Sequence, residues 1–96
     1  MERGRILEIL KAFTANNADK YGIESLALFG SFSRNEQKSD SDIDILVSLK
    51  KPSLYLYAAL KNDLESVLNH EVDIISAKSK LREEFKQSIA EDLIYV

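Results

Sequence analysis

The chain contains no cysteine, so disulfide bonds and thiolate metal sites are excluded. No apolar stretch approaches the length of a membrane span, and we expect no contact with a membrane. Basic residues are not in excess, because the formal net charge is −3 at pH 7. Nonspecific binding of nucleic acid needs a basic footprint, so we expect no direct contact with nucleic acid. The composition, 45% hydrophobic and 30% charged, is that of a globular soluble chain.

Internal repeats, low-complexity tracts and linkers are also absent from the sequence. The chain has 96 residues, the length of one domain, and we expect residues 1–96 to form a single domain. The first ten residues, MERGRILEIL, carry mixed charge and lack the apolar region of a signal peptide. A cytoplasmic location is therefore expected.

The spacing of apolar residues predicts seven elements in the order helix, strand, helix, strand, helix, strand, helix (αβαβαβα). The predicted helices cover residues 2–16, 32–36 and 52–69, with a last one capped by Ser79, and the predicted strands cover residues 25–29, 43–49 and 72–76. Such a chain packs a small sheet against helices, so the sequence predicts an α/β (α+β) fold.

The most informative stretch of the chain, residues 30–44, ends with two carboxylates, Asp42 and Asp44. They stand at the start of the stretch DIDILVSL, which is typical of a strand, and in a strand side chains two residues apart project from the same face. Acidic residues are depleted in strands and costly to bury unpaired, so their position beside Ile43 and Ile45 favours a functional role. Such a pair can share one or two Mg²⁺ ions, with waters and phosphate oxygens completing the coordination.

Gly30 and Ser31 follow the predicted buried strand SLALF. A glycine at the exit of a strand lets the backbone approach a ligand closely. Ser31 would begin the short helix over residues 32–36, whose N–H groups suit the oxygens of a triphosphate. Arg34 could add a cation there. Taken alone, a Gly-Ser pair is usually a turn and Arg34 a surface cation, so this assignment depends on the aspartates that follow.

A third carboxylate, Asp73, stands between Val72 and Ile74 in another predicted strand. Beside the other two aspartates it would complete a triad, bind a catalytic metal and help to activate an incoming hydroxyl. The sequence leaves open the alternative that Asp73 is a polar residue on the solvent face of an edge strand. Glu71 is a weaker rival for the same role, and His70, the only histidine, is assigned a structural role.

Together these residues resemble the motif of the minimal nucleotidyltransferase family, part of the DNA polymerase beta-like superfamily. The family pattern is Gly-Ser, a small residue and Arg-Gly, then Ser-Asp-x-Asp and a third Asp on a later strand. The matching residues here are Gly30, Ser31, Arg34, Ser41, Asp42, Asp44 and Asp73. Ser33 stands where Ala is typical, and Asn35 stands where Gly is expected. Asn tolerates a left-handed backbone better than most residues, so the turn can be kept.

The resemblance implies a nucleotidyltransferase fold with a mixed sheet, ATP as the substrate and two Mg²⁺ ions. It implies that Gly30, Ser31 and Arg34 bind the nucleotide. Asp42 and Asp44 would bind both metals, and Asp73 would bind the catalytic metal and polarise the acceptor hydroxyl.

The resemblance also implies a partner, because minimal nucleotidyltransferases are typically encoded beside a helical HEPN-domain protein. The pair would be a toxin–antitoxin module in which this chain transfers AMP to a tyrosine hydroxyl of a HEPN ribonuclease toxin. Two alternatives remain open at this point. The chain could be a binding module that inhibits its partner by contact, which Asn35 favours, or it could adenylylate a small molecule.

Overall fold

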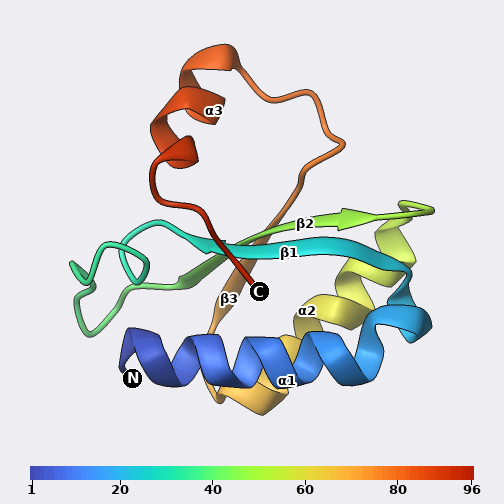
Figure 1. Ribbon diagram of the computed structural model, residues 1–96, viewed down its shortest axis with the longest axis horizontal. Helices are drawn as coiled ribbons and strands as arrows, with labels where there is room; N and C mark the ends of the chain where they lie inside the picture. The colour runs from blue at the N-terminus through green and yellow to red at the C-terminus, as the bar shows by residue number, and fades with distance from the viewer.

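The computed structural model describes residues 1–96 and contains three helices and four strands (Figure 1). In chain order these are α1 (Arg3–Tyr21), β1 (Ile23–Phe29), β2 (Ile43–Leu49), α2 (Leu54–Leu68), β3 (Val72–Ser76), α3 (Glu83–Ala90) and β4 (Ile94–Tyr95). The strands form one sheet in the order β3-β2-β1-β4, in which only the β2–β3 pair is parallel. The predicted α/β fold with a mixed sheet is therefore confirmed.

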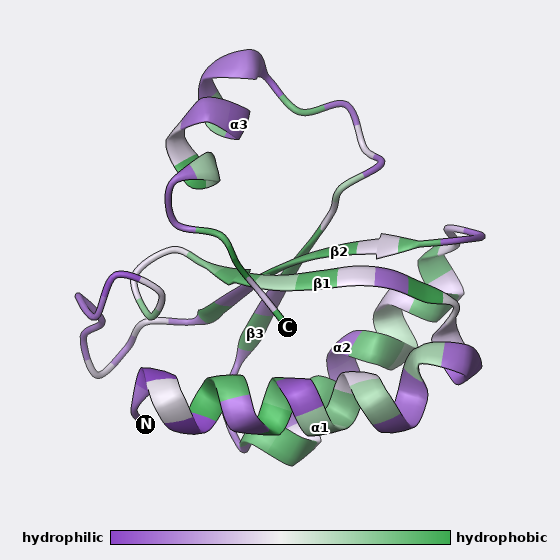
Figure 2. Ribbon diagram, in the orientation of Figure 1, coloured by the Kyte–Doolittle hydropathy of each residue, from purple (hydrophilic) through white to green (hydrophobic).

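The helices lie on opposite sides of the sheet: α1 and α2 cover one face, and α3 stands over the other (Figure 1). A cluster of 16 buried side chains fills the space between the sheet and the α1/α2 layer. The α3 layer is much thinner, because its buried apolar cluster consists of Phe29, Leu46 and Ile89. Figure 2 shows the same difference, since most of the α3 ribbon is hydrophilic whereas the middle of the sheet is hydrophobic. No helix is both long and apolar enough to cross a membrane.

Three residues cap the ends of α1 and α2. Gly22 ends α1 with a left-handed backbone (φ 68°), and its N–H donates to the carbonyl of Ala18. The hydroxyl of Ser53 caps the start of α2 by accepting from the N–H of Leu56 at 3.0 Å. Asn69 ends α2, again with a left-handed backbone (φ 51°). The chain is thereby turned back onto the sheet at the start of β1 and of β3.

The predicted order of elements is wrong at two places. No helix forms over residues 32–36, because the chain makes only one turn there: the N–H of Arg34 donates to Gly30 at 3.2 Å, and that of Glu36 to Ser31 at 2.8 Å. A fourth strand, β4, follows the last helix, where the sequence predicts no further element. The observed order is therefore α1-β1-β2-α2-β3-α3-β4.

Two predicted helix boundaries also differ from the structure. The first helix continues five residues past Asn16, to Tyr21, whose buried ring packs in the main core. Ser79 does not cap α3, because its hydroxyl donates to the carbonyl of Ser76 at 2.7 Å and forms part of the turn after β3. The last helix instead begins at Glu83.

Candidate active site

The three candidate aspartates lie on the face of the sheet that α3 covers. Along β2, alternate residues such as Ile43 and Ile45 enter the main core, which turns Asp44 to the opposite face. Asp42 directly precedes β2 and has the same parity as Asp44. In the parallel β2–β3 ladder, Asp44 is the direct partner of Asp73. Because partners in a ladder project from the same face, the structure brings Asp73 beside Asp44.

Gly30 directly adjoins the carboxylate of Asp44. Its backbone has φ 79°, in the left-handed region that favours glycine. A Cβ atom built at this position would overlap the Asp44 carboxylate, with Asp44 Cγ only 3.1 Å away. The end of β1 therefore approaches Asp44 as closely as a glycine alone allows.

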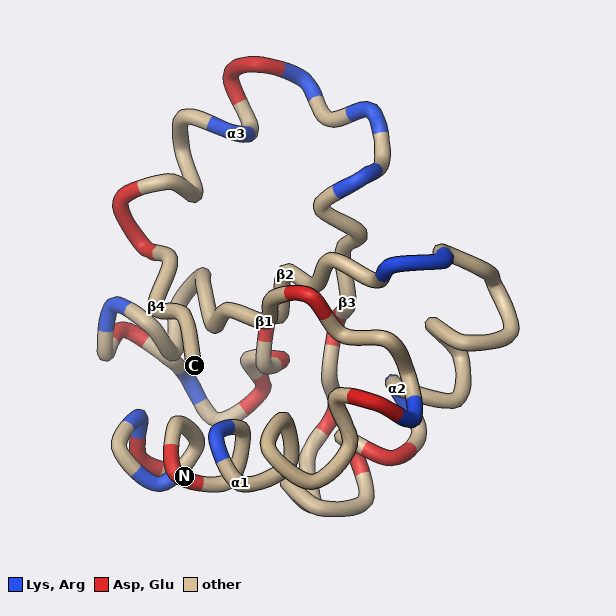
Figure 3. Tube along the Cα trace, turned by 45° about the vertical axis from the view of Figure 1, so that its right-hand side comes forward, with Lys and Arg blue, Asp and Glu red and all other residues tan.

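The charge on Asp44 is unfavourable in this environment. Burial raises the pKa of its carboxyl, the charges of Asp73 and Asp42 raise it further, and the charge of Arg34 opposes the shift. Most lysines lie elsewhere, for example in the turn after β2 and in the connection between β3 and α3 (Figure 3). Besides burial, the charges that shift the pKa of Asp44 are therefore those of Asp73, Asp42 and Arg34.

Residues 30–36, here called the motif loop, form a hydrogen-bonded turn that ends at Asn35. Asn35 adopts a left-handed backbone (φ 60°), which is the conformation a glycine would provide at this point. Within the turn, the backbone N–H groups of Ser31, Phe32 and Ser33 donate to no protein acceptor. Successive unpaired N–H groups in a tight turn form a concavity suited to an anion. The loop offers this feature without the helix that the sequence predicted.

Arg34 is held by two carboxylates, one from the motif loop and one from the corner between α3 and β4. Its Nη1 lies 2.5 Å from the carboxylate of Asp92, and its Nε lies 3.2 Å from that of Glu36. These hydrogen bonds, first that to Asp92, raise the pKa of Arg34. The positive charge of Arg34 also lowers the pKa of Asp44, although its guanidinium is paired with Asp92 and Glu36.

Asp42 also lines a small, wholly polar pocket beside the motif loop. The other residues of this pocket are Ser39, Asp40, His70 and Glu71. Glu71 is thus near Asp42, but Asp73 and not Glu71 pairs with Asp44 across the ladder. The His70 ring packs edge-on against Phe32 with a centroid distance of 5.4 Å, a packing role that agrees with the structural assignment.

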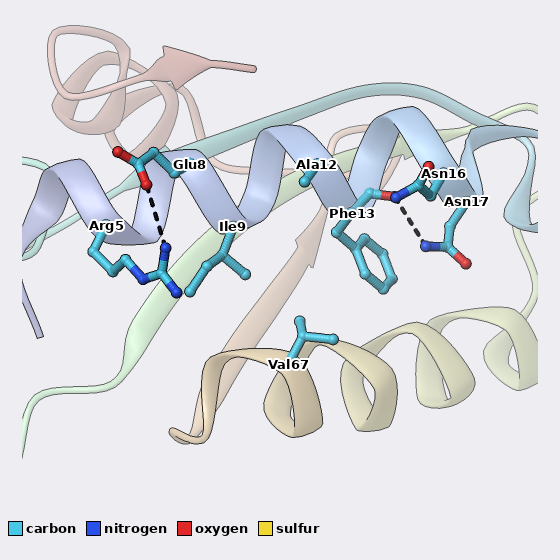
Figure 4. Close-up of a pocket in the computed structure, with 8 residues that line it drawn as sticks. All are labelled: Arg5, Glu8, Ile9, Ala12, Phe13, Asn16, Asn17 and Val67. Carbon is cyan, nitrogen blue, oxygen red and sulfur yellow. Dashed lines mark hydrogen bonds and ion pairs between the residues drawn. The ribbon is translucent and has the colours of Figure 1, made fainter.

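The largest surface groove is far from this site, between α1 and α2 on the other side of the sheet (Figure 4). Its lining residues are Arg5, Glu8, Ile9, Ala12, Phe13, Asn16, Asn17 and Val67. Several of its polar groups pair locally: Arg5 contacts Glu8 at 3.3 Å, and the Asn17 amide donates to the Phe13 carbonyl at 3.0 Å. None of the candidate residues lines this groove, so size alone would locate the site wrongly.

The carboxylates fit a hard cation but do not form a ready-made cage. No group of three or more Asp, Glu, His or Cys side chains is gathered closely enough to hold a metal ion. Mg²⁺ does not require such a cage, because it is usually bound by one or two carboxylates together with waters and substrate phosphates. The donor set consists of carboxylate oxygens, which suit Mg²⁺. Such a cation would also relieve the repulsion between Asp44 and the neighbouring aspartates.

The sequence does not indicate that Ser33 and Asp92 support the motif loop. Ser33 is the only buried polar residue, and its hydroxyl donates to the backbone carbonyl of Asp92. Asp92 lies 58 positions from Arg34, with which it also pairs. No local pattern connects such distant residues, so only the folded chain reveals that Asp92 is part of the site.

Comparison with known proteins agrees with the motif. Residues 6–96 match the family model described as the nucleotidyltransferase domain. A protein of Methanocaldococcus jannaschii, provisionally designated a protein adenylyltransferase, is 46% identical over 94 residues, which cover 95% of this chain and 94% of the relative. The protein adenylyltransferase MntA of Thermococcus cleftensis is 35% identical over 92 residues, covering 95% and 92%.

Solved structures share the same architecture. A protein provisionally designated a minimal nucleotidyltransferase superposes with a TM-score of 0.79 and 28% identity, covering 98% of this chain and 95% of that one. A chain from the complex of a tri-AMPylated Shewanella oneidensis HEPN toxin with its MNT antitoxin superposes with a TM-score of 0.59. That match is 21% identical and covers 97% of this chain and 66% of the other, so it shows likeness of fold alone.

Proposed function

Because this chain belongs to the nucleotidyltransferase domain family, we propose that it transfers AMP from ATP to a tyrosine hydroxyl of a HEPN-type ribonuclease toxin, and that it thereby acts as an antitoxin. The transfer would take place in the cytoplasm. The observation that carries the chemistry is the pairing of Asp44 with Asp73 on the face that Gly30 approaches. Relatives designated as protein adenylyltransferases match nearly the whole chain, which supports a protein as the acceptor.

The motif loop would bind the triphosphate. Gly30 lets the backbone come close, and the unpaired N–H groups from Ser31 to Ser33 would donate to phosphate oxygens. Arg34 would add a fixed positive charge at the same end of the site.

Asp42, Asp44 and Asp73 would hold Mg²⁺, which when bound would neutralise charge on the triphosphate and on the leaving group. The carboxylate of Asp73 would orient the acceptor hydroxyl and take its proton. The hydroxyl oxygen would then form a bond to the α-phosphorus as the bond to the β-phosphate oxygen breaks and pyrophosphate leaves. The partial burial of Asp44 would strengthen the electrostatic interactions of its carboxylate.

Asn35 bears on the alternative that the chain inhibits its partner by contact alone. That alternative rested on the loss of a glycine from the motif. Asn35 nevertheless adopts the left-handed conformation, so the motif loop keeps the backbone path that the chemistry requires. This observation supports transfer over inhibition by contact.

The test is transfer from α-labelled ATP with Mg²⁺ to the protein encoded by the neighbouring gene. We expect label on that protein with the wild-type chain and none with the Asp42→Asn/Asp44→Asn double variant. Asp73→Ala should slow transfer strongly while sparing part of the affinity for ATP. An unlabelled but stable complex that blocks the neighbour's activity would instead identify inhibition by contact.

A further inference from the structure

We infer that Asp92, at the corner between α3 and β4, is a positioning residue of the nucleotide site that acts through Arg34 and the motif loop. The inference rests on the proposed function, because it takes the motif loop as the seat of the triphosphate. The side chain of Asp92 bonds to Arg34 and not to the other aspartates. Its role would be to hold the groups that bind the nucleotide.

Asp92 contacts two successive residues of the motif loop through two different groups. Its carboxylate lies 2.5 Å from Arg34 Nη1, and its backbone carbonyl accepts the hydroxyl of Ser33. The Asp92 side chain is only 13% exposed, whereas that of Arg34 is 43% exposed. The acid is thus the less exposed member of the pair, and the arginine is the part that extends toward solvent.

The corner that carries Asp92 is itself fixed from both sides. Before it, the N–H of Asp92 donates to the carbonyl of Ile89 at 2.9 Å, and Ile89 is buried in the α3 cluster. After it, Ile94 and Tyr95 pair with β1 in the sheet. Figure 1 shows this segment descending from α3 beside the loop that follows β1. A support held at both ends in this way can orient the arginine side chain.

The pairing leaves Arg34 able to bind an anion. The two carboxylates engage Nη1 and Nε, so Nη2 of the five-donor guanidinium remains available. In the same arrangement, the positive charge of Arg34 lowers the pKa of Asp44. Without Asp92, the side chain would sample many rotamers, and ordering it would weaken ATP binding by the lost conformational entropy.

The experiment is a double-mutant cycle with Arg34→Gln, Asp92→Asn and the combined variant, read as the affinity for Mg-ATP and as KM and kcat for transfer. We expect Asp92→Asn to raise the Kd and KM for ATP by about tenfold while kcat changes much less. The combined variant should bind ATP no more weakly than Arg34→Gln alone, since Asp92 acts through that residue. Glu91→Gln is the matched control, because it removes the same charge from an exposed neighbour without an ion pair.

Asp92→Glu keeps the charge and should recover most of the ATP affinity, which a purely structural role would not predict for a longer side chain. It also keeps the inference testable if Asp92→Asn fails to fold. Additive losses in the cycle, or wild-type ATP affinity in Asp92→Asn, would overturn the role of Asp92. Wild-type chain that binds ATP in this Asp92-dependent way but labels no protein would overturn the proposed function alone. Absence of ATP binding by the wild type would overturn both.

Discussion

The two faces of the sheet differ in what their side chains do. The face under α1 and α2 contributes to a core of 16 buried residues, whereas the face under α3 has a three-residue apolar cluster next to the aspartates. Strand β2 belongs to both, because Ile45 points into the core and its neighbour Asp44 points to the site. Alternation along one strand thus separates packing from chemistry. Substitutions on one face should change mainly stability, and those on the other mainly activity.

The largest effect should follow from Asp44→Asn. Transfer should fall by more than about 100-fold, because even residues that only orient metal ligands are worth 10- to 100-fold. The melting temperature should stay the same or rise, since the charge of Asp44 is unfavourable where it lies. Labelled transfer and thermal unfolding measured by circular dichroism check both parts. Asp19→Asn, an exposed acid on α1, is the control that should change neither.

Matched truncations on the two faces should change stability unequally. Leu64→Ala in the main core should cost about 2–5 kcal/mol of unfolding free energy, because it leaves a closed cavity. Ile89→Ala under α3 should cost roughly half as much, since fewer buried neighbours surround it. Urea denaturation measures both. Equal losses would mean that the α3 face is as important for stability as the core.

Gly30→Ala should lower both stability and ATP affinity. The new methyl group meets the Asp44 carboxylate and requires φ 79° of a residue that disfavours it. A destabilisation of about 1–3 kcal/mol is expected, together with weaker ATP binding. Chemical denaturation and ATP titration provide the measurements. Gly4→Ala is the control and should be tolerated, because a Cβ atom at Gly4 would point into open space.

The pH dependence of stability should report the repulsion at Asp44 directly. Because the folded state raises the pKa of Asp44, the native protein holds this proton more tightly than the unfolded chain. Stability should therefore decline as pH rises from the ordinary carboxylate pKa through the raised value. Asp44→Asn removes this decline. The unfolding free energy of the variant minus that of the wild type should therefore grow across that pH window and then level off. A difference that is constant with pH would contradict the shift.

The smallest effect is expected for Asn35→Gly. Asn35 already adopts the left-handed backbone, so glycine should relieve less than about 1 kcal/mol of strain. The rate of transfer should stay within about twofold of the wild type. A many-fold gain in transfer would show instead that Asn35 limits the enzyme, and it would restore the case for inhibition by contact.

Much of the scaffold could be predicted from local pattern. The bounds of β2 and β3 agree with the prediction because apolar runs bordered by turn residues mark buried strands well. The sequence predicts a helix over residues 32–36, where the chain forms a single turn, because a hydrogen-bonded turn and a helical turn begin with the same residues. Strand β4 was missed because two residues, Ile94 and Tyr95, form a strand only by pairing with β1.

The candidate site could be predicted in part. Asp42 and Asp44 can be recognised as candidates from their spacing at the start of one strand, which is a local property. The sequence left the placement of Asp73 open, because the side of β2 on which β3 pairs, and its register, are determined by tertiary packing. Asp92 carried no signal at all, since its partners are Arg34 and Ser33 in a distant part of the chain.

The motif loop is held by residues from both ends of the described chain, and this affects the order in which the protein assembles. Arg3 donates to the Ser33 carbonyl at 2.9 Å, and Asp92 receives the Ser33 hydroxyl. On the ribosome, α1, β1 and β2 emerge long before the residues that form the α3–β4 corner. A nascent chain that already carries Asp42 and Asp44 would therefore lack half of the support of its nucleotide loop. Competence to bind ATP should appear only after the α3–β4 corner has emerged, when the scaffold has begun to fold.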